Sequence, residues 1–188
     1  GWARTGFAVL MLLFFLFPVY WMLNVSLQSG SSAVGATFFP VNPTFASYTA
    51  AFQQQWPHLL TSLIVAVGAV ILSLLIAVPA AYALSRYRIP GADVFLLVIL
   101  LTQMIPGIVV ANALYSAYSN LNMLNSIPGL ILADASLGIP FAILLLRPAM
   151  SAIPPAIVEA AEVDGSGALR TFLQIIVPMS RNTIVTAG

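Results

Sequence analysis

Few side chains in this sequence could carry out acid–base, nucleophilic or metal chemistry. The 188 residues include five acids, six arginines and a single histidine, His58, and they contain neither lysine nor cysteine. A P-loop and a Schiff base both need lysine, thiol catalysis needs cysteine, and an H-E-x-x-H zinc site needs two histidines. No G-x-S-x-G nucleophile elbow occurs. The composition therefore predicts that the chain is not an enzyme and binds no cofactor or metal of its own.

One of the five acids, Asp134, lies inside an apolar segment. A charge at membrane depth is costly and usually functional. Gly138 and Ala142 follow Asp134 at a spacing of four, and small residues at this spacing mark contacts between membrane helices. We therefore expect Asp134 to face protein, in the outer half of its span. A structural hydrogen bond and a contact at the mouth of a pore both fit this position, whereas a proton relay lacks a second acid or base.

Two more polar residues are candidates for lining a solute path. Gln103 lies one turn before Pro106, and Asn112 follows in the same apolar segment. Broken helices at membrane depth often line cavities, although neighbouring helices can also satisfy a kink. A second stripe at a spacing of four predicts helix packing and no ligand, and it consists of Ala69, Ser73, Ala77 and Ala81.

Three acids cluster in a polar segment near the C-terminal end of the sequence. Pro154-Pro155 suits a helix start, so we expect a helix over residues 156–163. Gly165 suits a left-handed turn after it, and apolar residues at helical spacing predict a second helix over 168–177, which Pro178 ends or kinks. Glu159 and Glu162 would share a face of the first helix.

Length and hydropathy predict an all-α integral membrane protein, a polytopic helical bundle formed by one incomplete domain, residues 1–188. The chain is 61% hydrophobic and 6% charged, with a mean hydropathy of +1.03, whereas a soluble domain carries about 25% charged residues. A span takes about 20 apolar residues. The segments that qualify are residues 7–27, 59–84, 94–115 and 127–146, and a fifth span begins near residue 182.

Arginine placement predicts the orientation. If the chain starts inside and crosses alternately, all six arginines fall on the cytoplasmic side, and the outer loop 28–58 and the outer residues 116–126 contain no Arg, Asp or Glu. By the positive-inside rule the N-terminus and the loop 147–181 are cytoplasmic. In the outer loop, Pro and Gly predict irregular structure, with a short helix over residues 45–52 at the membrane interface.

The spacing in loop 147–181 resembles the EAA loop of bacterial ABC-importer permeases. The family pattern is E-A-A, three residues, G, nine residues and I-x-L-P, and six of its seven fixed positions match, with Val177 in place of leucine. The resemblance implies that this loop docks onto a separate ATPase through these residues: Glu159, Ala160, Ala161, Asp164, Gly165, Ile175 and Pro178.

Two further segments resemble sugar permeases of the maltose-transporter type. They are AAYALSRYRIPG, which begins at Ala80, and Gln103-Met104-Ile105-Pro106. Because that family has six spans in the comparable region, the resemblance implies a chain truncated before the last spans. It also implies half of a translocation path in the bacterial inner membrane. The partners it implies are a second permease subunit, an ATPase dimer that binds ATP and Mg, and an external protein that delivers a sugar; nucleic acid is not a partner.

Two other functions remain open beside a sugar importer. An ABC permease for a polyamine or a phosphodiester would have the same docking loop. An ion-coupled secondary transporter would need coupling groups near the midplane, where Asp134 alone comes close. The candidate path residues are Gln103, Pro106, Asn112 and Asp134.

Overall fold

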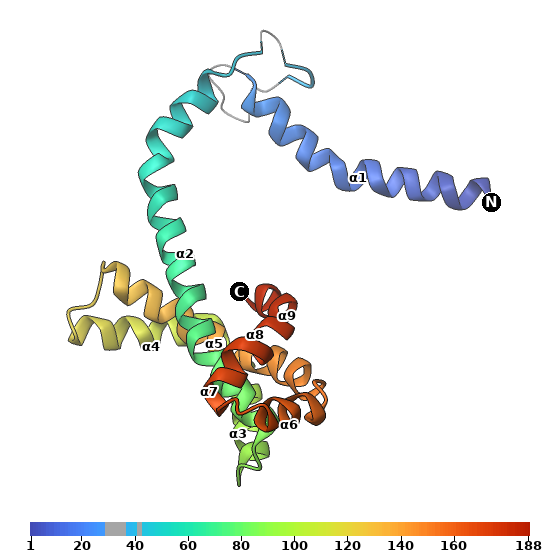
Figure 1. Cartoon of the computed structure of the whole chain (residues 1–188). Coiled ribbons are helices and arrows are strands. Elements are labelled where there is room, and N and C mark those ends of the chain that lie inside the picture. Colours follow the sequence, from blue (N-terminus) through green and yellow to red (C-terminus); the bar gives the residue numbers. More distant parts are fainter. Residues whose placement is uncertain (29–36, 41–42) are drawn as a thin grey trace. The chain divides into compact units, whose positions relative to one another are not determined.

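The computed structural model describes residues 1–28, 37–40 and 43–188, and this part of the chain consists of helices joined by turns (Figure 1). In chain order the helices are α1 (Trp2–Ser26), α2 (Ala46–Arg86), α3 (Ala92–Thr102), α4 (Gly107–Asn120), α5 (Ile127–Ser151), α6 (Pro155–Val163), α7 (Ala168–Thr171), the π-helix η1 (Phe172–Ile176), α8 (Val177–Met179) and α9 (Arg181–Ala187). The all-α fold class expected from the sequence is confirmed.

Three of these helices are long and apolar enough to cross a membrane. They are α1, α2 and α5, and the bent pair α3 and α4 would provide a fourth span. Prolines lie inside them, with Pro18 in α1 and Pro140 and Pro148 in α5. Membrane helices tolerate proline because neighbouring groups satisfy the freed backbone carbonyls. The composition of these helices therefore agrees with a polytopic membrane protein.

The chain divides into two compact units, Gly1–Leu60 and Thr61–Gly188. The sequence led us to expect one domain. The difference has a physical cause, because every buried apolar side chain of the described residues belongs to the second unit. Each unit is therefore described by itself.

In the first unit, the end of α1 is tied to residues 37–39. The Asn24 side chain is buried and its Nδ2 donates a hydrogen bond of 2.7 Å to the Thr37 carbonyl. Gln28 Nε2 donates to the same carbonyl at 3.0 Å, and the Tyr20 hydroxyl donates to the Phe38 carbonyl. The Phe38 ring also contacts three aromatic rings of α1, those of Phe17, Tyr20 and Trp21.

The predicted outer loop 28–58 is shorter than we expected. Helix α2 begins at Ala46, so residues 46–58 are helical, including Pro57. We had expected the prolines of this loop to break regular structure, but helix α2 runs through Pro57 into the apolar segment that follows it. Part of the predicted loop, residues 29–36 and 41–42 with Gly30, Gly35 and Asn42, lies outside the described residues.

The second unit is built around one apolar core between α2 and α5. Ala77, Ala81 and Leu146 are fully buried there. Helix α5 starts with the Ser126 side chain accepting a hydrogen bond of 3.1 Å from the Gly129 amide, which caps the helix. The helix continues to Ser151, five residues beyond the predicted span 127–146. Val158 of α6 and Ile176 of η1 join the same core, so the polar segment that follows α5 is anchored on the spans.

The predicted third span, residues 94–115, is two helices in the structure. Helices α3 and α4 meet at 95°, and the turn between them ends at Pro106, the N-cap of α4 (Figure 1). Proline lacks the N–H that a continuing helix needs, and the residue before it avoids the α region. A kink at Pro106 was expected, but a change of direction near a right angle was not.

Candidate functional site

The acidic segment after α5 folds as a helix, a tight turn and a second helix, as its sequence predicts. Pro155 is the first residue of α6 and Pro154 is its N-cap. Asp164 is the C-cap, and Gly165 has φ +79°. The Gly165 amide donates to the Glu162 carbonyl at 3.0 Å, and the Ser166 amide donates to the Ala161 carbonyl at 2.8 Å. These two bonds form a Schellman cap, and they confirm the left-handed turn expected at Gly165.

Helix α6 presents one face to the core and the other to solvent. Val158 and Ala161, three residues apart, are buried at 5% and 6% exposure. Glu159, Ala160 and Glu162 are exposed. The structure thus separates the alanine pair: Ala160 is available to a partner, whereas Ala161 packs within this chain. Spacing explains this result, because residues three apart on a helix share a face.

The second helix contains a wider turn. Residues 168–179 are helical, but Phe172–Ile176 form a π-helix that ends two residues before Pro178. A proline clashes with the carbonyl four residues earlier and cannot donate to it, and a π turn, with its longer i→i+5 bonds, gives that carbonyl room. Pro178 therefore lies inside the helix, which ends after Met179, and Ile175 is half-buried.

A polar hollow lies between α6 and the second helix. Its volume is about 300 Å³, and its lining residues include Ala160, Asp164, Arg170 and Gln174. Arg170 Nε donates to Gln174 Oε1 at 3.0 Å, which orients the guanidinium along the helix. At the tip beside it, two apolar side chains are exposed, Val163 at 88% and Leu169 at 70%. Exposed apolar side chains beside a polar rim are the arrangement that protein interfaces use.

Asp134 lies at a second hollow, on the span helices. It is exposed, and it lines a cavity of about 150 Å³ together with Ser73, Gly138 and Phe141. Within the described residues it makes no hydrogen bond or ion pair. The expected stripe is therefore only partly correct: Ala142 is buried and Gly138 half-buried, whereas Asp134 is at the open end. A structural hydrogen bond, one of the two alternatives, is absent from this part of the chain.

Helices α2 and α5 are in close contact beside the Asp134 cavity. The Ser73 hydroxyl donates to the Ala135 carbonyl at 3.3 Å. A Cβ at Gly138 would lie 2.9 Å from the Ser73 Oγ, so a larger residue there would displace the Ser73 hydroxyl. The packing stripe expected on α2 is confirmed, since all four of its members are buried: Ala69, Ser73, Ala77 and Ala81.

The sequence did not lead us to Phe141, and three of the candidate path residues that it did suggest lie away from the Asp134 cavity. Phe141 follows Asp134 by seven residues, which places both on one helix face, and this spacing could have identified it. The other path candidates are Gln103 at the end of α3, Pro106 at the start of α4, and Asn112 on α4. All three are exposed, and none of them lines the Asp134 cavity.

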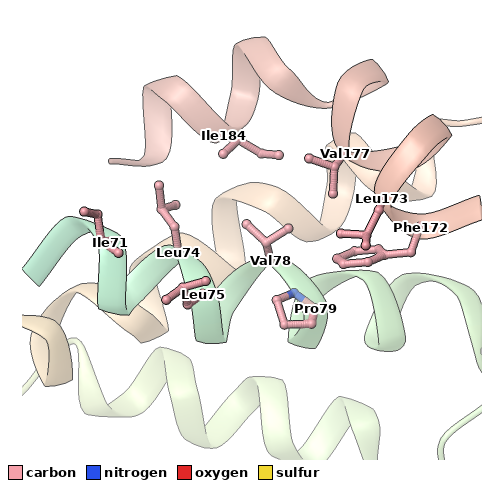
Figure 2. A pocket seen from close by; sticks show the side chains of 9 residues that line it. All are labelled: Ile71, Leu74, Leu75, Val78, Pro79, Phe172, Leu173, Val177 and Ile184. Atoms are coloured by element: carbon pink, nitrogen blue, oxygen red, sulfur yellow. The ribbon is translucent and has the colours of Figure 1, made fainter. Parts of the chain in front are cut away.

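An apolar groove of about 380 Å³ runs between α2 and the second helix of the candidate segment (Figure 2). Leu74, Leu75 and Val78 line it from α2, and Phe172 and Val177 line it from the opposite wall. Its lining offers almost no hydrogen-bonding groups. The groove can therefore accept apolar groups but would leave a polar solute without hydrogen-bond partners.

Comparison with known proteins identifies a family and several relatives. Residues 69–187 match the family described as the binding-protein-dependent transport system inner membrane component. The diacetylchitobiose uptake system permease protein DasC of Streptomyces coelicolor is 34% identical over 92% of this chain and 64% of its own length. The sulfoquinovosyl glycerol transport system permease protein SmoH of Agrobacterium fabrum is 33% identical over 92% and 62%. The galactooligosaccharides transport system permease protein GanQ of Bacillus subtilis is 33% identical over 95% and 66%.

The chain thus spans less than two thirds of the length of each of these relatives. The family match, however, covers α2 from Ala69 onward, the helices α3 to α5, the Schellman-capped helix α6 and the helices after it. The chain therefore belongs to the family of binding-protein-dependent transport system inner membrane components.

Proposed function

We propose that this chain is a permease subunit of an ATP-driven importer and forms part of the translocation path for a sugar. The observation that carries the proposal is helix α6. It is anchored on the span core by Val158 and Ala161, and it exposes Glu159 and Ala160. Such a helix transmits force from a bound partner to the spans, because its inner face is part of their core.

The proposed partner at α6 is a cytoplasmic ATPase. This chain has no lysine and therefore no P-loop lysine, so ATP and Mg would bind to the partner and the permease itself would be non-catalytic. Glu159 would accept charge-assisted hydrogen bonds from cationic side chains of the ATPase. The hollow that contains Asp164 and Arg170 would receive a polar side chain from the same partner.

The proposed solute is a sugar, delivered from outside by a solute-binding protein. The relatives support this choice, because their names include a diacetylchitobiose, a sulfoquinovosyl glycerol and a galactooligosaccharide system. The Asp134 cavity has suitable chemistry. An unpaired carboxylate accepts hydrogen bonds from sugar hydroxyls, and the Phe141 ring presents an apolar face for the C–H groups of a pyranose. A second permease subunit would supply the opposite wall of the path.

The proposed setting is the bacterial inner membrane, with the N-terminus in the cytoplasm. The arginine distribution supports this orientation. It places α6 on the side where ATP is available. Binding of ATP would close the ATPase dimer, move α6, and bias a path that has two states of access.

The test is uptake by the full-length permease assembled with its partners in proteoliposomes. A panel of radiolabelled sugars, namely diacetylchitobiose, trehalose and a galactooligosaccharide, is offered with the solute-binding protein, beside a polyamine and a phosphodiester. We expect one sugar to be taken up only when ATP is present. Uptake that persists without ATP but needs an ion gradient would show a secondary transporter, and uptake of the polyamine or the phosphodiester alone would overturn the sugar assignment.

Charge reversal at Glu159 tests the docking surface in the same assay. Hydrogen bonds to charged groups are worth about 1.5–3 kcal/mol, so Glu159→Lys should weaken retention of the ATPase by about tenfold or more. Asp93→Lys is the matched control, since Asp93 is an exposed acid in the first turn of α3. Equal retention of the ATPase by both variants would contradict docking at α6.

A further inference from the structure

The end of helix α2 is a junction between three parts of the second unit. Its last four carbonyls lack partners within the helix, and Arg147 of α5 donates from Nε to one of them, the Leu84 carbonyl, at 3.4 Å. The Tyr82 ring contacts Phe172 of η1, with ring centroids 5.1 Å apart. Arg86, in the last turn of α2, reaches in the other direction and donates from Nη2 to the Pro155 carbonyl at 3.2 Å.

The Pro155 carbonyl is an informative acceptor because Pro155 is the first residue of α6. In an α-helix the carbonyl of residue i accepts from the amide of residue i+4, which here is the amide of Glu159. A carbonyl has two lone pairs, so the same oxygen also accepts from Arg86. One atom thus connects the side chain at the end of α2 to the turn that carries Glu159.

Removal of Arg86 would release one end of α6 without unfolding it. The helix stays attached to the core through Val158 and Ala161, and its far end is closed by the Schellman cap at Gly165. The Arg86 bond is the hydrogen bond through which the start of α6 is tied to α2 in the described part of the chain. Its loss should therefore change how α6 and α2 move together more than it changes whether α6 forms.

We propose that Arg86 is a positioning residue that couples helix α6 to helix α2, so that movement of the docked ATPase reaches the span directly. The inference rests on the proposed function, in which α6 is the docking helix. A simpler role for Arg86 is a positive charge that stabilises the C-terminus of α2 and marks the cytoplasmic side. The two roles differ in their consequence, because only the coupling role changes the amount of sugar moved for each ATP.

The test compares matched arginines two residues apart. Arg86→Met keeps most of the side-chain length but removes the charge and the donors. Arg88→Met removes the same charge from the same turn region, and Arg88 is exposed and makes no hydrogen bond or ion pair within the described residues. Arg86→Lys restores a charge and a donor. Each variant of the full-length permease is assembled with its partners and assayed with the panel sugar that the wild-type complex takes up.

The readouts are the ATPase content of the purified complex and the ratio of sugar imported to ATP hydrolysed. We expect Arg86→Met to retain the ATPase and to lower the ratio about three- to tenfold, as loss of one exposed hydrogen bond of ordinary net strength would. Arg88→Met and Arg86→Lys should stay near the wild-type ratio. An unchanged ratio in Arg86→Met, or loss of the ATPase from that complex, would overturn the proposal.

The proposed function is judged separately, on the wild-type complex. Import of a sugar with ATP hydrolysis by that complex supports the permease assignment whatever the variants do. A failure confined to the Arg86 variants therefore counts against the coupling role alone.

Discussion

At the scale of single residues, Gly165 is restricted by its backbone and not by its neighbours. Its φ is +79°, and a Cβ built there would meet no atom within 4 Å. A substitution therefore costs the left-handed strain of an L-residue, about 1–2 kcal/mol. Gly167, two residues on, also has open space around it but has φ −73°, where any residue is comfortable.

The pair gives a prediction with an internal control. Gly165→Ala should open the Schellman cap in part of the population and reduce ATPase retention by about 5- to 30-fold, the factor that corresponds to this strain. Gly167→Ala should leave retention close to the wild-type level. Quantitative co-purification of the ATPase, with permease abundance in the membrane held equal, distinguishes the two; similar retention would show that the left-handed turn does not govern docking.

Asp134 allows a residue-scale test of the solute path. Asp134→Asn keeps the shape of the side chain but replaces a charged acceptor with a neutral one, which weakens a hydrogen bond to a hydroxyl by about half. We expect a rise in the sugar concentration for half-maximal uptake, by about tenfold. Ser136→Ala on the same helix is the control, because Ser136 is exposed and its hydroxyl donates to the Ala133 carbonyl of its own helix. An unchanged concentration dependence in Asp134→Asn would show that the Asp134 carboxylate does not contact the sugar.

Residue-level predictions from the sequence succeeded where local rules decide the outcome. The φ of Gly165 and the helix start at Pro155 follow from conformational preferences of glycine and proline, which act without distant contacts. The separation of Ala160 from Ala161 depends on which face of α6 meets the core, and the cavity at Asp134 depends on how α2 and α5 pack against each other. Both features are set by tertiary packing, which cannot be read directly from a single sequence.

At the scale of helices, the contact between α2 and α5 forms the core that stabilises the second unit. Ala77 and Ala81 are fully buried, and Leu146 fills the space opposite them. Small residues on one helix and a large residue on the other let two membrane helices approach closely. The interface therefore has no room for added side-chain volume.

Overpacking this interface should destabilise the protein. Ala77→Leu adds three carbon atoms at a fully buried position, and such changes cost about 1–3 kcal/mol. Ala66→Leu is the control, since Ala66 is exposed on the same helix. Thermal unfolding in detergent, followed by the loss of the monodisperse elution peak, should show a lower midpoint for Ala77→Leu alone. Equal midpoints would mean that the α2–α5 contact is looser than the burial of Ala77 indicates.

Helix positions were predictable from apolar length, but helix directions were not. The runs 59–84 and 127–146 fall within α2 and α5. The break at Pro106 was visible as a proline in an apolar run, yet the 95° angle depends on how α3 and α4 pack. Hydropathy likewise placed the start of the second span at residue 59, because residues 46–58 are mostly polar or aromatic even though they belong to the same helix.

At the scale of the whole molecule, the positive-inside rule makes a prediction about sidedness. All six arginines fall on one side under the N-in arrangement, and each would be costly to move across the membrane. A reporter that is active only outside the cytoplasm, fused after Asn122, should be active, and the same reporter fused after Gly167 should be silent. The reverse pattern would place α6 outside and would remove the basis for its docking to an ATPase.

The π-helix Phe172–Ile176 has a geometric consequence for this arrangement. A π turn holds about one residue more than an α turn, and each residue of an α-helix advances about 100° and 1.5 Å. Met179 and its neighbours are therefore rotated by about a quarter turn relative to the position that an unbroken α-helix from Ala168 would give them. Conversion of this turn to regular α geometry would therefore rotate everything that follows Pro178 about the helix axis and shift it along that axis.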